Sequence, residues 1–248
     1  MNKARSRYIL VAVAAALSVA LAAAEPLSRA QIAHRLEAGE RDLRNLEAPA
    51  GDLSGLDFHG ANLFGASLKG ANLSKAKLQG CNLDVAILRN AVLVEADMRG
   101  VSLFSSVLAN ANLTGADLSG ARLMANMEGA VLEGANLADV KAGADMRNQP
   151  MGQIRAVLTH ARLKGARLTG ADFSRADFSF ADLRAADLSN ANLTRAKLIG
   201  ADLSGARLDH ATLTGAEIEN ANFTAVQGLT SVQGLDTAVG KEAAVFAQ

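Results

Sequence analysis

Residues 156–225 read, in groups of five, AVLTH ARLKG ARLTG ADFSR ADFSF ADLRA ADLSN ANLTR AKLIG ADLSG ARLDH ATLTG AEIEN ANFTA. Every group opens with alanine, and every third residue is large and apolar, from Leu158 to Phe223. The other three positions are polar or small and vary from group to group. An unbroken period of five is typical of a repeat architecture, in which each repeat packs on its neighbours.

This period excludes the ordinary secondary structures. In an α-helix, five residues advance the side-chain direction by about 500°, so leucines at this spacing form no apolar stripe. In a flat strand, every fifth residue alternates between the two faces. The leucines share one environment only if the chain bends regularly and each unit is a rotated copy of the last. That arrangement is a solenoid with the large residues inside.

The alanines fit the same geometry. Each alanine lies two residues before a large apolar residue, so in an extended segment both side chains point inward. A narrow interior that takes one large side chain per unit leaves room for only a small second one. Three exceptions in this column are small or of modest size: Cys81, Val101 and Ser106. Cys81, the only cysteine, is therefore expected to be a buried filler.

Tandem A(D/N)LXX units, such as ADLSN at 186–190 and ANLTR at 191–195, resemble those of the pentapeptide-repeat family. The resemblance covers about residues 41–225. It implies an all-β fold, a right-handed quadrilateral β-helix with four units per coil. At about 4.8 Å per coil, about nine coils would form a rod of roughly 45 Å.

The first 24 residues have the pattern of a secretory signal peptide. Lys3, Arg5 and Arg7 precede an apolar run, and an A-x-A pattern at 22–24 precedes Glu25. We expect cleavage of residues 1–24 and a periplasmic or secreted mature protein with no membrane span. An uncleaved N-terminal membrane anchor is the alternative, because the apolar run is borderline in length for a span.

Composition argues against a nucleic-acid partner. Removing the signal changes the formal charge from zero to −3, since 25 basic residues less three leaves 22 against 25 acidic ones. A nucleic-acid binder would show a basic stripe. The chain also lacks tryptophan, and its only tyrosine, Tyr8, lies in the predicted signal, so platforms for stacking bases are scarce.

The segments on either side of the repeats are expected to close the solenoid. Residues 25–40 are predicted to form a capping helix over the first coil, with Ser28 and Gln31 as a capping box and Gly39 as the stop. A helix that binds a partner is the functional alternative for this segment. Residues 226–248 are expected to form a C-terminal cap or tail, with turns at Gly228 and Gly234 and a short helix over 241–246. A dimerisation element is the alternative, since some members of the family form head-to-head dimers through such tails.

The repeats are interrupted at 126–155. NMEG and VKAG read as units one residue short, and QPMGQIR reads as an insert. Three interpretations remain open: a surface loop or kink in one continuous rod, a binding loop, and a hinge between two shorter rods. A binding loop is attractive because function concentrates in loops that a rigid scaffold positions.

Several positions that should point outward are apolar. With four units per coil, each residue stacks on the residue four units further along the chain. The candidate interaction patch, which Asp84 interrupts, consists of Phe64, Phe104 and Met124 on one face, Ile87 and Val107 on the next, and Val92 and Val94 nearby. An exposed apolar patch marks an interface or a surface that another segment covers. The cover could be the N-terminal helix or the 126–155 segment; the interface could be with a protein partner or a second copy.

The charged positions stack with mixed signs. The expected stacks are Asp177 with Lys197 and Glu217, Arg167 with Asp187 and Arg207, and the like-charged pair Asp182 and Asp202. The quinolone-resistance members of the family resemble DNA in shape and charge and bind DNA gyrase. DNA carries one negative charge per about 1.7 Å of axis, so a mimic should be acidic along one surface. This chain fits such a role poorly, but a gyrase-binding DNA mimic is the alternative function.

Enzyme chemistry finds little support in the sequence. The four histidines, His34, His59, His160 and His210, form no cluster with metal-ligand spacing, and no phosphate-binding motif occurs. We expect no catalytic residues, no metal and no cofactor. The prediction is an exported, non-enzymatic scaffold in the cell envelope, with an unknown protein partner or self-association, a homodimer being possible. A module that binds envelope polymers through polar surface residues is a further alternative.

Overall fold

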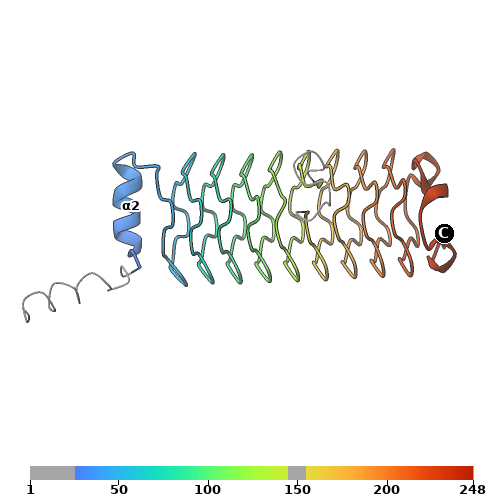
Figure 1. Cartoon of the computed structure of the whole chain (residues 1–248), viewed down its shortest axis with the longest axis horizontal. Helices are drawn as coiled ribbons and strands as arrows, with labels where there is room; N and C mark the ends of the chain where they lie inside the picture. Colours follow the sequence, from blue (N-terminus) through green and yellow to red (C-terminus); the bar gives the residue numbers. More distant parts are fainter. Residues whose placement is uncertain (1–25, 145–154, 248) are drawn as a thin grey trace, which may run out of the picture.

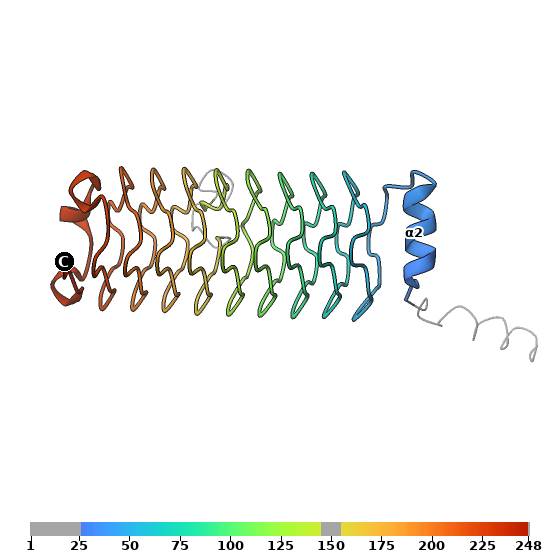
Figure 2. The same cartoon turned by 180° about the vertical axis from the view of Figure 1, so that it is seen from behind.

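The computed structural model describes residues 26–144 and 155–247. In these residues the chain winds into a long rod, with helix α2 (Arg29–Glu37) at one end and the C-terminal segment at the other (Figure 1 and Figure 2). The predicted signal peptide and residues 145–154 of the predicted insert lie outside the described residues.

Parallel β-bridges join each unit to the unit one coil further on. The usual bridge joins a residue to the equivalent residue four units later, as in Asn62↔Asn82, so a coil contains four five-residue units. Four ladders of bridges run along the rod, and we number them by their first residues: Asp42, Glu47, Asp52 and Asp57. The turn after each ladder is the corner of the same number. The right-handed winding implied by the family resemblance stays a prediction.

One residue in each unit makes the bridge, and the described residues contain isolated bridges rather than extended strands. The N–H of Asn82 donates to the Ala61 carbonyl of the preceding coil at 3.0 Å, and the Asn82 carbonyl accepts from Leu63 at 2.7 Å. The N–H of Ala66 turns the corner by donating to the Leu63 carbonyl at 3.0 Å. The chain changes direction every five residues, so no longer strand can form, yet each bridge residue inside the rod pairs with the coils on both sides.

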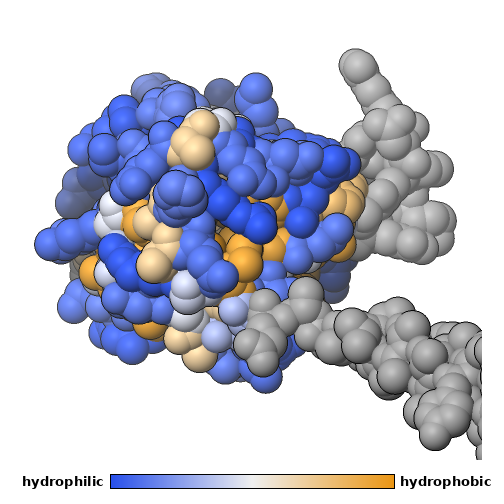
Figure 3. Space-filling view, turned by 90° about the vertical axis from the view of Figure 1, so that its left-hand side faces the viewer, coloured by the Kyte–Doolittle hydropathy of each residue, from blue (hydrophilic) through white to orange (hydrophobic). Residues whose placement is uncertain are grey.

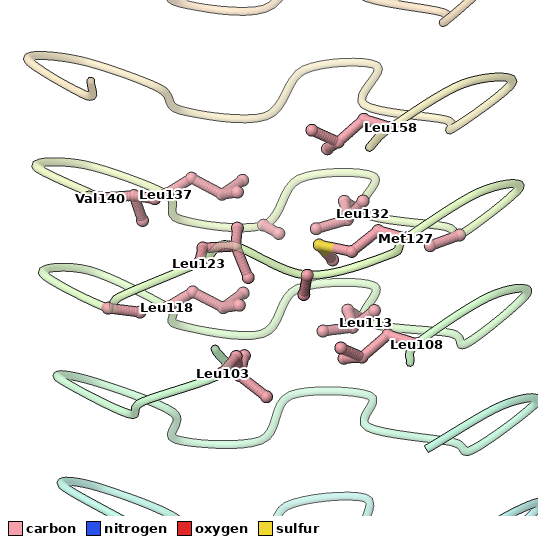
Figure 4. Packing of buried hydrophobic residues seen from close by; sticks show 14 of the residues in the cluster. Leu103, Leu108, Leu113, Leu118, Leu123, Met127, Leu132, Leu137, Val140 and Leu158 are labelled. Atoms are coloured by element: carbon pink, nitrogen blue, oxygen red, sulfur yellow. The ribbon is translucent and has the colours of Figure 1, made fainter. Parts of the chain in front are cut away.

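The alanine column and the leucine column, which were both predicted to point inward, are buried. The third residues of the units, such as Leu103, Leu108 and Leu113, point into the coil (Figure 4) and are fully buried. The alanines two residues earlier are buried beside them. Each buried leucine side chain stabilises the rod by about 1.5–3 kcal/mol before its entropy loss is counted.

The small polar exceptions in the alanine column are hydrogen-bonded. The Cys81 thiol donates to the Phe58 carbonyl at 2.9 Å, and the Ser106 hydroxyl donates to the Leu83 carbonyl at 2.7 Å. Burial raises the pKa of the Cys81 thiol to about 12. The thiol is therefore protonated and unreactive at neutral pH, as expected for a buried filler.

The last residue of each unit turns the corner in the left-handed conformation. Glycine often holds this position, as at Gly60 (φ 66°), and asparagine also serves, as at Asn90 (φ 58°). The repeat nevertheless tolerates larger residues there, including Val85 (φ 62°) and Phe180 (φ 60°). These residues accept a backbone conformation that L-residues disfavour.

The missing residue lies earlier than predicted. The bridge Val107↔Asn126 is one residue shorter than the regular step, and the N–H of Asn126 donates to the Ser106 carbonyl. Residues 121–124 are thus the four-residue unit, and 125–129 is a complete one. The prediction of a short unit at NMEG was wrong because Ala125 opens the next unit instead of closing the previous one.

The prediction that VKAG is short was also wrong. Val140 and Ala142 are both fully buried and hold the first and third positions of a complete unit at 140–144. Compared with a regular unit, the small and the large side chain have exchanged places, with valine in the alanine column and alanine in the leucine column. The pair therefore fills a volume similar to that of a regular alanine and leucine pair. The bridge Lys141↔Asp172 then exceeds the regular step by eleven residues.

The ladders continue across this interruption. Asn126 bridges to Val157 and Asn136 bridges to Arg167, each with the same excess of eleven residues, after which the regular step returns. The described residues therefore form one continuous rod, and two rods joined by a hinge are not observed. The interpretation of the insert as a binding loop concerns residues outside those described.

Helix α2 lies across the N-terminal end of the rod (Figure 1). Ser28 accepts from the Gln31 N–H, and the Gln31 side chain accepts from the Ser28 N–H at 2.8 Å, which confirms the capping box. Ile32 and Leu36 are buried in the core cluster, so the helix covers the first coil as predicted. Figure 3 views this end, where hydrophilic residues surround a smaller apolar area.

The tail adds one coil with a different period. A regular bridge joins residues that are 20 apart in the sequence. In the tail this separation grows to 21 at Thr212↔Gln233, 22 at Glu217↔Val239 and 23 at Asn222↔Val245, so each of these sides has six residues. The extra residue is accommodated by three 3-10 helices: η2 (Leu229–Ser231), η3 (Leu235–Thr237) and η4 (Lys241–Ala243). The predicted turns at Gly228 and Gly234 are confirmed, but the predicted helix over 241–246 was wrong beyond η4.

Candidate interaction surface

The second residue of a unit fixes the outward direction of the fourth. In about half of the units it is Asp or Asn, and its side-chain oxygen accepts the N–H two residues later, as Asn72 does from Ser74 at 3.1 Å. Asp187 accepts from Ser189 in the same way at 3.0 Å. This Asx turn explains the A(D/N)LXX pattern. Ladder positions and corner positions therefore form the outer surface.

Large apolar residues gather on the first corner in the N-terminal half. Phe64 is 42% exposed, and Val85, one coil further on, is 47% exposed. The N–H of Val85 donates to the Phe104 carbonyl at 2.9 Å, which places Phe104 in the following coil at the same corner. Val85 was missed because its position was read only as a turn.

The ring of Phe104 is partly covered by a charged cluster. The Arg122 guanidinium lies 4.2 Å from the ring centroid, and its Nη1 lies 3.7 Å from Asp84 Oδ2. Asp84 Oδ1 also accepts the Phe104 N–H at 2.8 Å and the Ser102 hydroxyl. Asp84 therefore organises this part of the patch and does not simply interrupt it.

The outward placement of Met124 was wrong. Met124 is only 7% exposed, and it ends the four-residue unit 121–124. That unit lacks the left-handed fifth residue present at regular corners. Because the corner is one residue shorter, the side chain of its fourth residue is drawn inward.

The neighbouring ladders divide the remaining candidates. Ile87 is 44% exposed and bridges to the half-buried Val107 on the second ladder, directly after the first corner. Val92 lies on the third ladder between Asn72 and Asn112, and Val94 follows it. Both are half-buried and are separated from the others by the second corner. We name as the apolar ridge Phe64, Val85, Ile87, Phe104 and Val107.

The charged stacks occur as predicted. Bridges join Asp177 to Lys197 and Lys197 to Glu217, with alternating sign. They also join Arg167 to Asp187, Asp187 to Arg207, and Asp182 to Asp202.

The like-charged pair Asp182 and Asp202 is compensated by Arg184. Its Nε and Nη2 donate to Asp182 at 2.8 and 2.7 Å, and its Nε lies 3.9 Å from Asp202. The Arg184 guanidinium lowers the pKa of the Asp182 carboxyl. The expected repulsion is therefore offset by a residue that position counting did not pair with either aspartate.

A second exposed aromatic lies on the second corner. Phe180 is 57% exposed and stacks on His160, with ring centroids 5.3 Å apart and an interplanar angle of 11°. Its other side faces Gly200, where a Cβ would come within 2.7 Å of the ring. One ring face is thus covered by His160, and more than half of Phe180 remains exposed. Its position at the end of ADFSF was the only sequence signal for it.

Across residues 26–144 and 155–247, no group of three or more His, Cys, Asp and Glu side chains is arranged to hold a metal ion. No helix in those ranges has the length and apolarity needed to cross a bilayer.

The repeat profile of the family described as pentapeptide repeats matches eight copies, at residues 51–80, 66–103, 105–124, 154–190 and 186–224. These matches cover more than half of the chain. The chain therefore belongs to the pentapeptide-repeat family. No curated protein sequence matches it.

Solved structures of the same kind are similar to the chain. HetL from the cyanobacterium Nostoc sp. strain PCC 7120, a pentapeptide repeat protein involved in heterocyst differentiation regulation, is 30% identical; the match covers 88% of this chain and 98% of HetL, with a TM-score of 0.39. Full-length QnrB1, a plasmid-mediated fluoroquinolone resistance protein, is 17% identical over 83% of this chain and 89% of QnrB1, with a TM-score of 0.45. A pentapeptide repeat protein from the Arabidopsis thaliana thylakoid lumen is 28% identical over 50% and 69%, with a TM-score of 0.23. Family membership rests on the repeats and not on these superpositions.

Proposed function

We propose that this protein is an exported, non-enzymatic scaffold that binds a protein partner on the apolar ridge of a right-handed quadrilateral β-helix. The observation that supports a docking role is the exposure of Phe64, Val85 and Ile87 on two successive coils, at 42%, 47% and 44%. Apolar side chains gathered on one surface of a soluble rod are typical of an interaction site. The ridge lies on backbone fixed by four ladders of hydrogen bonds, so binding would require little reorganisation of the scaffold.

The cluster beside the ridge suits a protein partner. Aromatic residues and arginine are enriched at the centres of protein interfaces. Here the Phe104 ring and the Arg122 guanidinium are held together at 4.2 Å, and Asp84 fixes both. A partner would meet a preorganised pair surrounded by apolar side chains.

Site-specific crosslinking tests the docking role. A photoreactive phenylalanine analogue at position 64 should give a discrete crosslinked adduct in cells, and Ile87→Asp should remove that adduct. The matched control places the analogue at position 180, a more exposed aromatic position on another corner. Equal adducts from positions 64 and 180, or none from position 64, would contradict the proposal.

Export is proposed from the signal pattern of residues 1–24. The test is the intact mass of the native protein after the periplasm and cytoplasm are separated. A soluble periplasmic chain that begins near Glu25 is expected. A full-length chain in the membrane fraction would indicate an anchored scaffold, and a full-length chain in the cytoplasm would contradict export.

The alternating charges favour a scaffold over a DNA mimic. Asp177, Lys197 and Glu217 follow one another along one ladder, so no continuous acidic line forms there. A gyrase-binding role would require such a line, because a duplex presents a dense array of negative charge.

Self-association through the C-terminal coil is a second candidate function. Val239 and Val245 in that coil are 60% and 51% exposed, and no residue of 226–247 is fully buried. Sedimentation velocity should show a dimer that Val239→Lys with Val245→Lys converts to a monomer. A monomer at all concentrations for the unaltered chain would remove this candidate.

A further inference from the structure

The side of the rod that carries the apolar ridge also carries two exposed cations. Lys69 and Arg89 are the fourth residues of their units, at the second corner. The N–H of Gly70 donates to the Arg89 carbonyl at 2.9 Å, so Arg89 lies one coil after Lys69 at the same corner. Each cation is two residues beyond a residue of the second ladder, Ser67 or Ile87. The apolar ridge therefore borders the two cations along the second corner.

These two cations differ from the others in this half of the rod because they have no anionic partner. Residues 41–124 contain eight Lys and Arg residues. Arg41 donates to the carbonyls of Leu36 and Glu40. Five others form ion pairs with carboxylates: Arg44, Lys75, Lys77, Arg99 and Arg122. No carboxylate of the described residues forms an ion pair with Lys69 or Arg89, so both can bind a carboxylate of a partner.

A partner must recognise this side of the rod through side chains. The N–H of Ile87 donates to the Ala66 carbonyl at 2.8 Å, and the Ile87 carbonyl accepts from Leu68 at 2.8 Å. Val107, on the next coil, pairs in the same way with the unit of Ile87. The second ladder therefore has no open edge here to which a partner could add a strand. An amphipathic helix needs no such edge, because it binds by its apolar side chains.

Two carboxylates on the same side favour a discrete partner over a flat anionic surface. Glu47 lies on the second ladder one coil before Ser67, and Glu128 lies at the second corner two coils after Arg89; both are exposed. A flat anionic surface would meet these carboxylates together with the cations and would be repelled by them. Four coils, about 19 Å, separate the two glutamates. A helix of about 10 Å diameter fits between them and still reaches Lys69 and Arg89.

We infer that the apolar ridge, together with Lys69 and Arg89, binds an acidic amphipathic helix of a protein partner. The helix crosses this side of the rod, with its apolar side chains on the ridge and its carboxylates at the two cations. Asp84 does not oppose this arrangement, since its charge is already paired with Arg122. The inference rests on the proposed docking role and specifies the chemistry of the partner.

The test uses the photoreactive phenylalanine analogue at position 64 in cells, and mass spectrometry identifies the segment of the partner to which it becomes joined. The expected segment has apolar residues at positions i, i+3 or i+4, and i+7, with Asp or Glu residues within about two turns of them. Lys69→Gln with Arg89→Gln should lower the yield of the adduct about fivefold or more, because charges at the rim of an interface increase the rate of association.

The matched control is Lys75→Gln with Lys77→Gln, which removes two exposed cations at the third corner and on the fourth ladder. The control should keep the yield within about twofold of the unaltered chain, and a loss equal to that of the Lys69 and Arg89 variant would overturn the inference. A crosslinked segment without acidic residues, or an unchanged yield in the Lys69 and Arg89 variant, would overturn the inference and leave the docking role standing. No adduct from position 64 would overturn both.

A second measurement distinguishes the helix from a membrane surface. The purified protein is mixed with vesicles that contain phosphatidylglycerol, and the bound fraction is measured by flotation. The unaltered protein should float no more than the variant with Lys69→Gln and Arg89→Gln. Flotation that this variant loses would assign the ridge and the two cations to an anionic membrane and would overturn the inference.

Discussion

The two ends of the rod are closed in different ways. At the N-terminal end the chain changes secondary structure, and α2 buries Ile32 and Leu36 against the first coil. Arg29 on this helix donates to the Asp52 and Ser54 carbonyls at 3.0 and 2.8 Å. Backbone acceptors and apolar side chains of the first coil are therefore covered together.

At the C-terminal end the chain keeps its architecture and changes its period. The bridge residues of the six-residue sides pair with the coil before them, as in Val245 N–H to the Ala221 carbonyl at 2.9 Å, and at two corners the hydroxyls of Ser231 and Thr237 accept the N–H groups of His210 and Gly215. Among the described residues nothing covers this coil in turn, and Val226, Val232 and Leu235 remain only partly buried. The stacked pair Phe223 and Phe246, with centroids 5.0 Å apart, shields part of the core.

The difference separates two tasks of a cap. One more coil pairs the backbone of the coil before it but leaves the backbone groups on its own outer side unpaired, whereas a segment that lies across the end can cover backbone groups and the apolar interior together. The N-terminal end is covered in the second way, and the C-terminal end is extended in the first. Substitutions should therefore be tolerated unequally at the two ends.

The largest loss of stability is expected for a substitution in the middle of the rod, which serves as the reference for substitutions at the two ends. Leu188→Asp places an unpaired charge at a fully buried position and should lower the free energy of unfolding by about 4 kcal/mol or more. Thermal denaturation followed by circular dichroism measures it, with the exposed Asn190→Asp as control. A normal melting curve for Leu188→Asp would refute its inward position.

The next prediction compares the loss of stability caused by an alanine substitution at each end. Ile32→Ala should cost about 2–4 kcal/mol, because Ile32 is fully buried under the N-terminal cap. Val245→Ala should cost less than about 1 kcal/mol, because half of that side chain is already exposed. Urea denaturation of both variants gives the two values, and equal costs would show that the ends are sealed alike.

For glycine substitutions, the larger loss of stability is expected at the C-terminal end. Gly234 (φ 71°) lies against Thr214, where a Cβ would come within 2.7 Å of the Thr214 Cα. Gly234→Ala should therefore cost about 2–3 kcal/mol from backbone strain and the clash. Gly39 (φ 81°) has open space beside it, so Gly39→Ala should cost about 1–2 kcal/mol. Denaturation midpoints in the opposite order would contradict the tight packing of the last coil on the coil before it.

The smallest effect concerns the start of α2. Ser28→Ala removes the hydroxyl of the capping box and should cost about 1 kcal/mol. The same method measures it, with Ser28→Asp as the control because aspartate also caps helices. No difference between the alanine and aspartate variants would mean that α2 is held by its packing alone.

Much of this fold follows from the sequence because the period of five fixes the environment of each position. The inward columns, the stacks of equivalent residues one coil apart and the capping box of α2 could all be predicted from residue types and spacing. The missing residue could not be located, since Ala125 reads equally well as the end of ARLMA or the start of ANMEG. Only the pairing of Asn126 with Val107 decides between these frames.

The surface was harder to predict because corners depend on local conformation. Met124 has an outward position in a five-residue unit and an inward one in a unit of four. Val85 and Phe180 hold the left-handed position, which is associated with small turn residues, so their exposure was missed. The compensation of Asp202 by Arg184 involves a neighbour on the next coil, which a count of same-position residues cannot reveal.

Chain length varies only at the corners of this rod. One coil loses a residue before Ala125, the last coil gains one on each side, and eleven extra residues follow 144, yet the ladders on either side stay in register. Insertions and deletions can therefore be accommodated at the corners without changing the register of the ladders in the rest of the rod. Such a rod can diversify its edges over evolutionary time while its interior remains uniform.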